Sequence, residues 1–171
     1  MFDKFGEFDS CEELNRAAAA QLEEGDEDAV RKIAEENGLE PEDAEDFILG
    51  SVNELATPVM AALGKLKVEK NDMQPEEIME DWFGYIEACT LESSAMAAAV
   101  RKKGKSLKGC VALLLGWSFK NAKEVEKSIV QEAAKSCKEI TTVGHGRAWL
   151  GIPGMKTARK LIRDYYLGAQ K

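Results

Sequence analysis

The sequence predicts an all-α fold, a multi-helix bundle of short helices, with one small β-hairpin as an option near residues 139–152. Three observations favour this class. Apolar residues recur at spacings of three and four through nearly the whole chain. Ser, Asp and Pro residues that start helices precede these stripes, and glycines follow them. The 171 residues, 44% hydrophobic and 32% charged, are enough to bury a core without disulfides or metals.

The first two helices are marked by their start and stop residues. Ser10 and Glu13 have the spacing of a capping box, in which each side chain accepts a hydrogen bond from the other residue's backbone. An apolar stripe then runs as far as Gly25, which is predicted to end the helix. Asp26 is predicted to cap a short second helix, and Gly38 to end it in the left-handed conformation that glycine tolerates.

Prolines mark the next segments. Pro41 suits the first turn of a third helix, because its fixed φ is already helical and its missing N–H is not needed there. The apolar positions of that predicted helix are Phe47, Ile48, Val52 and Leu55. Pro58 is expected to kink or restart the chain. Residues 71–75 are expected to form a loop.

A longer helix is predicted after this loop, with an apolar and aromatic stripe on one face. The stripe consists of Ile78, Trp82, Phe83 and Ile86. Such a stripe is more typical of a core than of a platform on which nucleic-acid bases stack, and we interpret it as core.

The second half of the chain predicts three or four further helices. A helix near residues 93–102 should end at Gly104, and Ser106 should cap the next one. That next helix, residues 107–119, is apolar almost throughout and is therefore expected at the centre of the protein, covered on nearly all sides. An amphipathic helix is expected between residues 121 and 135, and Pro-Gly introduces a last helix at residues 155–167.

Charge divides the chain into an acidic and a basic part. Residues 1–50 contain 4 Lys or Arg against 17 Asp or Glu, whereas residues 101–171 contain 16 against 5, within a net charge of −8. We therefore expect an acidic helical part at 1–92 and a basic helical part at 93–171. Such asymmetry indicates that the two ends attract each other or meet different partners.

Several protein classes are disfavoured. The longest apolar run, residues 110–117, is far shorter than the ~20 residues of a membrane span, and the acidic N-terminus lacks the pattern of a secretory signal. We therefore expect a cytoplasmic protein with no membrane partner. The four cysteines form no CxxC pair and His145 is the only histidine, so the sequence predicts no zinc site, no disulfide framework and no cofactor.

The sequence also offers no convincing catalytic group. His145 lies in a Gly-His-Gly turn without an acidic neighbour to orient it. Cys110 or Cys137 could meet it in space, but a buried thiol is the favoured interpretation of a cysteine on an apolar helix. The glycine-rich segments lack the spacing of phosphate loops. We therefore predict that the protein is not an enzyme.

Two charged clusters remain as candidate partner-binding residues. The acidic cluster comprises Glu23, Glu24, Asp26, Glu27 and Asp28. The basic cluster comprises Arg101, Lys102, Lys103, Lys105 and Lys108, together with Arg159 and Arg163 of the last predicted helix. Much of this charge has an alternative explanation, because acids at helix starts and bases at helix ends are favoured by the helix dipole.

The basic part resembles a known family. RKKGKSLKGC, an apolar helix, an amphipathic helix, an irregular insert and ARKLIRDYYLG follow in the order seen at the C-terminal end of the PcfK-like proteins of bacterial conjugative elements. The match covers residues 97–168 and is sharpest at Lys105-Ser106, at residues 108–110 and at residues 164–166. This resemblance implies a small, non-catalytic protein of a plasmid, phage or integrative element. The family includes inhibitors of the type II CRISPR effector nuclease.

Three functional interpretations follow. In the first, the acidic part competes for the positively charged nucleic-acid channel of a CRISPR effector nuclease or its guide complex. In the second, an accessory protein binds nucleic acid through the basic part, although residues 1–100, with 7 basic and 26 acidic side chains, should make binding to free DNA weak or absent. In the third, the two parts attract each other, within one chain or across a homodimer, and the charges are structural.

Overall fold

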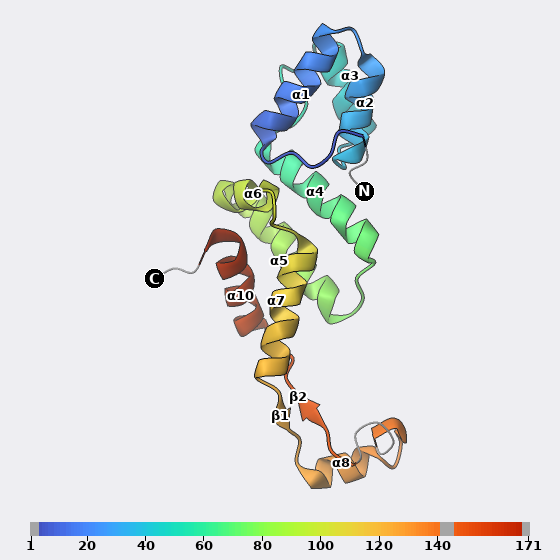
Figure 1. Ribbon diagram of the computed structural model, residues 1–171, viewed down its shortest axis with the longest axis vertical. Coiled ribbons are helices and arrows are strands. Elements are labelled where there is room, and N and C mark those ends of the chain that lie inside the picture. The colour runs from blue at the N-terminus through green and yellow to red at the C-terminus, as the bar shows by residue number, and fades with distance from the viewer. Residues whose placement is uncertain (1–3, 141–145, 169–171) are drawn as a thin grey trace.

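The computed structural model describes residues 4–140 and 146–168, and it confirms the all-α class with one small two-stranded sheet. The molecule is elongated (Figure 1). The first three helices lie at one end, the sheet and a short helix lie at the other, and the longer helices pack between them. None of the helices in the described ranges is long and apolar enough to cross a membrane.

The first two helices begin where the sequence predicts. In α1 (Cys11–Glu23), the Ser10 hydroxyl accepts a hydrogen bond from the Glu13 N–H at 3.1 Å. The Glu13 carboxylate, however, accepts from the Asp9 N–H and not from that of Ser10, so the predicted capping box is shifted by one residue. In α2 (Glu27–Glu36), the Asp26 carboxylate accepts from the Ala29 N–H at 2.9 Å. Both caps use contacts within four residues, which is why the sequence could predict them.

The third helix is shorter than predicted. α3 (Pro41–Ile48) has Pro41 in its first turn, as expected, but it ends at Ile48. Gly50 follows with φ +71°, a left-handed conformation that stops the helix. Val52 and Leu55 therefore lie in an irregular segment that returns to α4 (Pro58–Met73).

Two hydrophobic cores meet along α4. The first core is formed by residues from Phe8 to Ala61 and holds α1, α2 and α3 together. The second core runs from Ala62 to Tyr166 and involves α4, α5 (Ile78–Glu92), α6 (Ser94–Arg101), α7 (Leu107–Lys120) and α10 (Met155–Leu167). The expected boundary at residue 92 does not coincide with this division, because α5 and α6, on either side of it, share the second core.

The aromatic stripe of α5 lies in the second core, as predicted, with Trp82, Phe83 and Ile86 buried. The prediction for α7 was wrong, because this helix is not covered on nearly all sides. Only Leu107, Cys110 and Leu114 of α7 are buried. Leu113, Leu115 and Phe119 of this helix are exposed to solvent.

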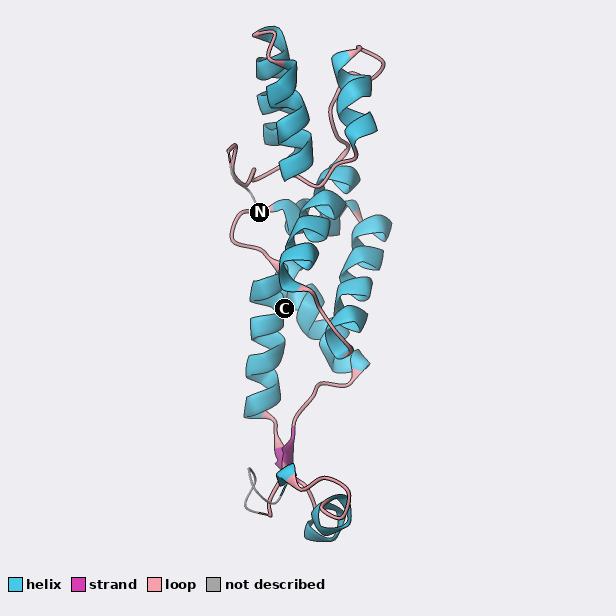
Figure 2. Ribbon diagram, turned by 90° about the vertical axis from the view of Figure 1, so that its right-hand side faces the viewer, coloured by secondary structure: helices cyan, strands magenta, loops and turns pink. Residues whose placement is uncertain are grey.

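The small sheet does not have the predicted connection. β2 (Trp149–Leu150) lies in the predicted range of 139–152, but its antiparallel partner is β1 (Lys123–Glu124), and the short helix α8 (Lys127–Ala133) lies between them (Figure 2). β1 thus takes residues that were expected to be helical. Arg147 binds Glu124 through two hydrogen bonds of 2.6 and 2.8 Å, a contact across 23 residues that helps to pair the strands. Gly144 and His145 of the predicted Gly-His-Gly turn lie outside the described residues.

Candidate functional site

The acidic residues singled out in the sequence gather on one turn. We use the name acidic tip for Glu23, Glu24, Asp26, Glu27 and Asp28. All five are exposed, and they lie where α1 ends and α2 begins, at the end of the molecule remote from the sheet (Figure 1). The turn is held from below by the first core, in which Leu14, Ala18, Val30 and Ile33 are fully buried. The acidic tip is therefore a fixed projection of a packed helix pair.

Part of the charge of the acidic tip is paired with a basic side chain of the same protein. Arg31 forms ion pairs with Glu27 and Asp28 at 3.1 Å each, and with Glu45 of α3 at 2.6 Å. The hydrogen bond from Arg31 lowers the pKa of Glu45 below its usual value. Glu23 and Glu24 are exposed and form no ion pair among the described residues.

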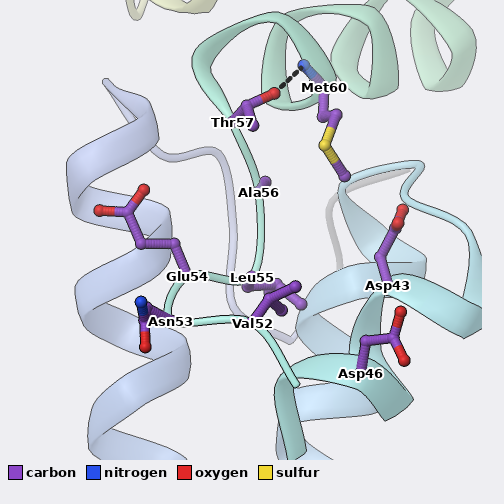
Figure 3. A pocket seen from close by; sticks show the side chains of 9 residues that line it. All are labelled: Asp43, Asp46, Val52, Asn53, Glu54, Leu55, Ala56, Thr57 and Met60. Carbon is purple, nitrogen blue, oxygen red and sulfur yellow. Dashed lines mark hydrogen bonds between the residues drawn. The ribbon is translucent and has the colours of Figure 1, made fainter. Parts of the chain in front are cut away.

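A hollow of about 450 Å³ opens beside α3, in the helical unit that also carries the acidic tip. Asp43 and Asp46 lie on one side of it, and Val52 and Leu55 of the irregular segment lie on the other, with Met60 above (Figure 3). The Thr57 hydroxyl caps α4 by accepting from the Met60 N–H at 3.3 Å. The hollow thus combines two carboxylates with an apolar floor.

No motif in the sequence points to this hollow. In the sequence, Asp43 and Asp46 are two carboxylates three residues apart, a spacing expected by chance in so acidic a segment. They line a hollow only because the irregular segment 49–57 folds back against α3 and supplies the apolar wall. Gly50, which follows the last residue of α3, is a local signal that the helix stops here and that the chain can turn back.

Arg101 does not belong to an exposed surface, which corrects its assignment to the partner-binding cluster. Its side chain is 1% exposed and donates to the Asn37 side chain and to the Ala61 carbonyl oxygen. Lys102, Lys103 and Lys108 are exposed, and Lys105 is half-buried. The cluster therefore contains a buried member because α6 turns one face toward the first core.

The corner between α6 and α7 is tied to acidic residues by its backbone. Lys65, which is fully buried, forms an ion pair with Glu7 and donates to the carbonyl oxygen of Lys105 at 2.7 Å. The Asp9 carboxylate accepts from the Lys103 N–H at 2.6 Å. Acidic and basic parts therefore do meet in the chain, but through these few contacts and not through the acidic tip.

The motifs that carry the PcfK-like resemblance meet each other at this corner. The Ser106 N–H donates to the Tyr165 hydroxyl at 3.0 Å, and the Lys105 ammonium lies 4.6 Å from the centre of the Tyr165 ring. A Cβ at Gly109 would lie 2.3 Å from the same hydroxyl, so a side chain there would displace the tyrosine. Lys105, Ser106 and Gly109 thus have a structural role against α10.

Three of the remaining predicted cations line two different hollows. Arg159 and Arg163 are exposed and line a hollow of about 640 Å³ together with Tyr85, whose ring lies 5.1 Å from the Arg159 guanidinium. Lys108 lines a different hollow, beside Glu69. The charge of the basic part is therefore divided between separate hollows.

The cysteines, the single histidine and possible metal ligands are the remaining candidates for catalysis or metal binding. Cys11 and Cys110 are buried, and burial raises the pKa of the Cys110 thiol to about 12. No group of three or more His, Cys, Asp or Glu side chains in the described ranges could hold a metal ion. His145 lies outside the described residues.

No family model, no curated protein and no solved structure matches the chain. The candidate site is therefore defined by the geometry of this chain. It consists of the acidic tip and the hollow beside α3, which share one rigid unit built on the first core.

Proposed function

We propose that the protein is a non-catalytic inhibitor of a type II CRISPR effector nuclease, made by a mobile element and acting in the cytoplasm of its bacterial host. The acidic tip and the hollow beside α3 form the surface that occupies the basic nucleic-acid channel. One observation carries this proposal: five exposed carboxylates lie on a single turn that a packed helix pair projects from the end of the molecule.

The nucleic-acid channel of the proposed target has the opposite charge to the acidic tip. An RNA-guided nuclease holds its guide and target strands in a positively charged channel, and it reads the neighbouring DNA motif with arginines. A rigid acidic projection has the sign needed to enter that channel, and its field can raise the association rate by ~10 to 10³ at low salt. Because the tip is already ordered, binding does not have to order a flexible segment.

The hollow beside α3 suits a long cationic side chain from the partner. Lys and Arg have apolar stems and charged ends. The stem would lie on Val52 and Met60, and the charged end would reach Asp43 and Asp46. A hollow of this chemistry therefore favours a basic protein surface over a negatively charged nucleic acid.

The alternative of a nucleic-acid-binding accessory protein has less support. One of its predicted phosphate contacts, Arg101, is buried, and another, Lys105, lies against Tyr165. Arg159 and Arg163 line one hollow and Lys108 lines another, whereas phosphate binding along a duplex needs a continuous stripe of cations.

A cleavage assay with purified type II effector, guide and target DNA tests the proposal. Asp26 is left unchanged in the tip variant, because its carboxylate caps α2 and its loss would also destabilise the helix. The variant Glu23→Lys/Glu24→Lys should raise the concentration needed for half-inhibition at least ~10-fold, and wild-type inhibition should weaken as salt rises. The matched control Glu92→Lys/Glu132→Lys changes the net charge equally, from −8 to −4, at exposed sites outside the tip and should inhibit like wild type.

Two results would contradict the proposal. The first is equal inhibition by the tip variant and its control, because the tip would then contribute nothing specific. The second is a pull-down from bacterial lysate in which wild-type protein recovers nucleic acid and no nuclease, which would select the accessory-protein alternative.

A further inference from the structure

α10 carries three neighbouring cations on its exposed side. Arg159, Lys160 and Arg163 form no ion pair with any residue in the described part of the chain. Arg163 lies four residues after Arg159 and three after Lys160, so like charges are neighbours on the helix surface, an arrangement that destabilises a helix. The second core packs on a different face of α10. The packing of the fold therefore does not explain this cluster.

All three cations line the hollow of about 640 Å³ to which α5 contributes Tyr85. The Arg159 guanidinium lies 5.1 Å from the centre of the Tyr85 ring, a cation–π contact that holds this side chain in place. Burial raises the pKa of Tyr85, and the charges of Arg163 and Arg159 oppose that rise, so both guanidinium groups act on the same side of the hollow. The volume is in the range of sites for small molecules.

The lining of the hollow has an excess of positive charge. Three cations and the one carboxylate of Asp164 give it a net charge of +2. Asp164 lies four residues after Lys160, but the two side chains form no ion pair in the structure as described. Asp81 and Glu92 lie four residues before and seven after Tyr85 on α5, and neither lines the hollow. The lining charge therefore matches a ligand group with two negative charges.

We propose that this hollow binds a small molecule through a phosphate monoester group. Such a group carries about −1.5 to −2 charges at pH 7 and has three acceptor oxygens. Guanidinium groups bind phosphate oxygens through pairs of parallel hydrogen bonds, so Arg159 and Arg163 hold the group and Lys160 adds charge. Leu167, which is 40% exposed, provides an apolar surface for the organic part of the molecule.

A nucleic-acid strand fits this hollow less well. Each phosphate of a strand is a diester with one negative charge, and a strand gains affinity from many phosphates along its length. The cations of the hollow lie within residues 159–163 of one helix, and residues 1–100, with 7 basic and 26 acidic side chains, repel a long polyanion. A small dianion needs only the local site.

The hollow is also separate from the acidic tip. It is built on α5 and α10, which pack in the second core, whereas the acidic tip belongs to the first. Binding of a phosphate monoester therefore stands independently of the proposed function, and a loss of one activity does not imply a loss of the other.

Titration of the isotope-labelled full chain with phenyl phosphate, followed by nuclear magnetic resonance, tests the proposal. Wild type should bind with a dissociation constant of ~1 mM or lower at low salt, with shifts at residues of α5 and α10 that line the hollow. Arg159→Gln/Arg163→Gln should raise that constant at least ~10-fold, because both guanidinium contacts are lost.

Lys120→Gln/Lys127→Gln is the matched control. It removes the same charge, from −8 to −10, at exposed positions outside the hollow, and it should bind phenyl phosphate like wild type. Circular dichroism should show that both variants keep the wild-type helix content. Benzoate carries the same ring with only one negative charge and should bind wild type at least ~5-fold more weakly than phenyl phosphate.

Three results would overturn the proposal. The first is an absence of shifts around the hollow at ~10 mM phenyl phosphate. The second is equal affinity of the arginine variant and its control, because binding would then occur elsewhere. The third is benzoate binding as tight as that of phenyl phosphate, or single-stranded DNA that displaces phenyl phosphate at an equal concentration of phosphate groups, since the hollow would then not select a monoester dianion.

Discussion

The guanidinium of Arg101 donates a hydrogen bond to the side-chain oxygen of Asn37, a contact between residues 64 positions apart. Both side chains are buried, and a second bond of 3.2 Å runs from Arg101 to the Ala61 carbonyl oxygen. Burial lowers the pKa of Arg101, since the charged form loses its contact with water. The residue therefore ties the end of α2, the start of α4 and the end of α6 together at the junction of the two cores.

Arg101→Ala should lower the free energy of unfolding by about 2–4 kcal/mol. The substitution removes a buried side chain and leaves Asn37 and the Ala61 carbonyl without these bonds. Lys102→Ala is the control, because Lys102 is the exposed neighbour and should change stability by no more than ~0.5 kcal/mol. Urea unfolding followed by circular dichroism measures both. Equal stability of the two variants would contradict the role assigned to Arg101.

Gly64→Ala should destabilise the protein by about 1–3 kcal/mol, because its Cβ would lie 2.1 Å from the Asn37 carbonyl oxygen, where α4 crosses the end of α2. The matched control is Gly84→Ala in α5, whose Cβ would meet nothing within 4 Å. That change should stabilise the protein by up to ~1 kcal/mol through helix propensity. Opposite shifts in melting temperature are expected. A Gly64→Ala variant as stable as Gly84→Ala would rule out the close approach.

The corner between α6 and α7 depends on two local features. Gly104 has φ +80°, so Gly104→Val should cost more than ~1 kcal/mol through its unfavourable left-handed conformation. The Ser106 hydroxyl accepts from the Gly109 N–H at 3.0 Å, so Ser106→Ala should cost about 1 kcal/mol. Ser94→Ala, at an exposed position beside the cap Ser93, should have little effect. Thermal melts that leave both corner variants unchanged would contradict the turn and the cap.

Thiol alkylation should separate the cysteines into two classes. With a pKa of about 12, Cys110 would be thiolate in only about one molecule in 10⁴ at pH 8, and the thiolate is the reactive form. Cys11 is also buried with a raised pKa, whereas Cys89 and Cys137 are partly exposed. Mass spectrometry of native protein treated with iodoacetamide should show modification at Cys89 and Cys137 first. Rapid modification of Cys110 without unfolding would refute its burial.

The sequence by itself determined where most helices start. Ser10, Asp26, Ser93 and Ser106 cap helices through hydrogen bonds to residues only three positions away, so the signal and the contact lie in the same few residues. The acidic tip was predictable for the same reason, because its five carboxylates are neighbours in the sequence. Short-range contacts of this kind depend little on the rest of the fold.

Only the tertiary structure decided which charged and apolar side chains are covered. Arg101 looked like a surface cation until Asn37 and Ala61 were brought to it from other helices. α7 looked like a central helix, yet Phe119 is exposed because no described element packs over that face. The hollow beside α3 likewise needs the returning segment 49–57. Burial depends on contacts between residues far apart in sequence, and hydrophobic periodicity does not say which elements will meet.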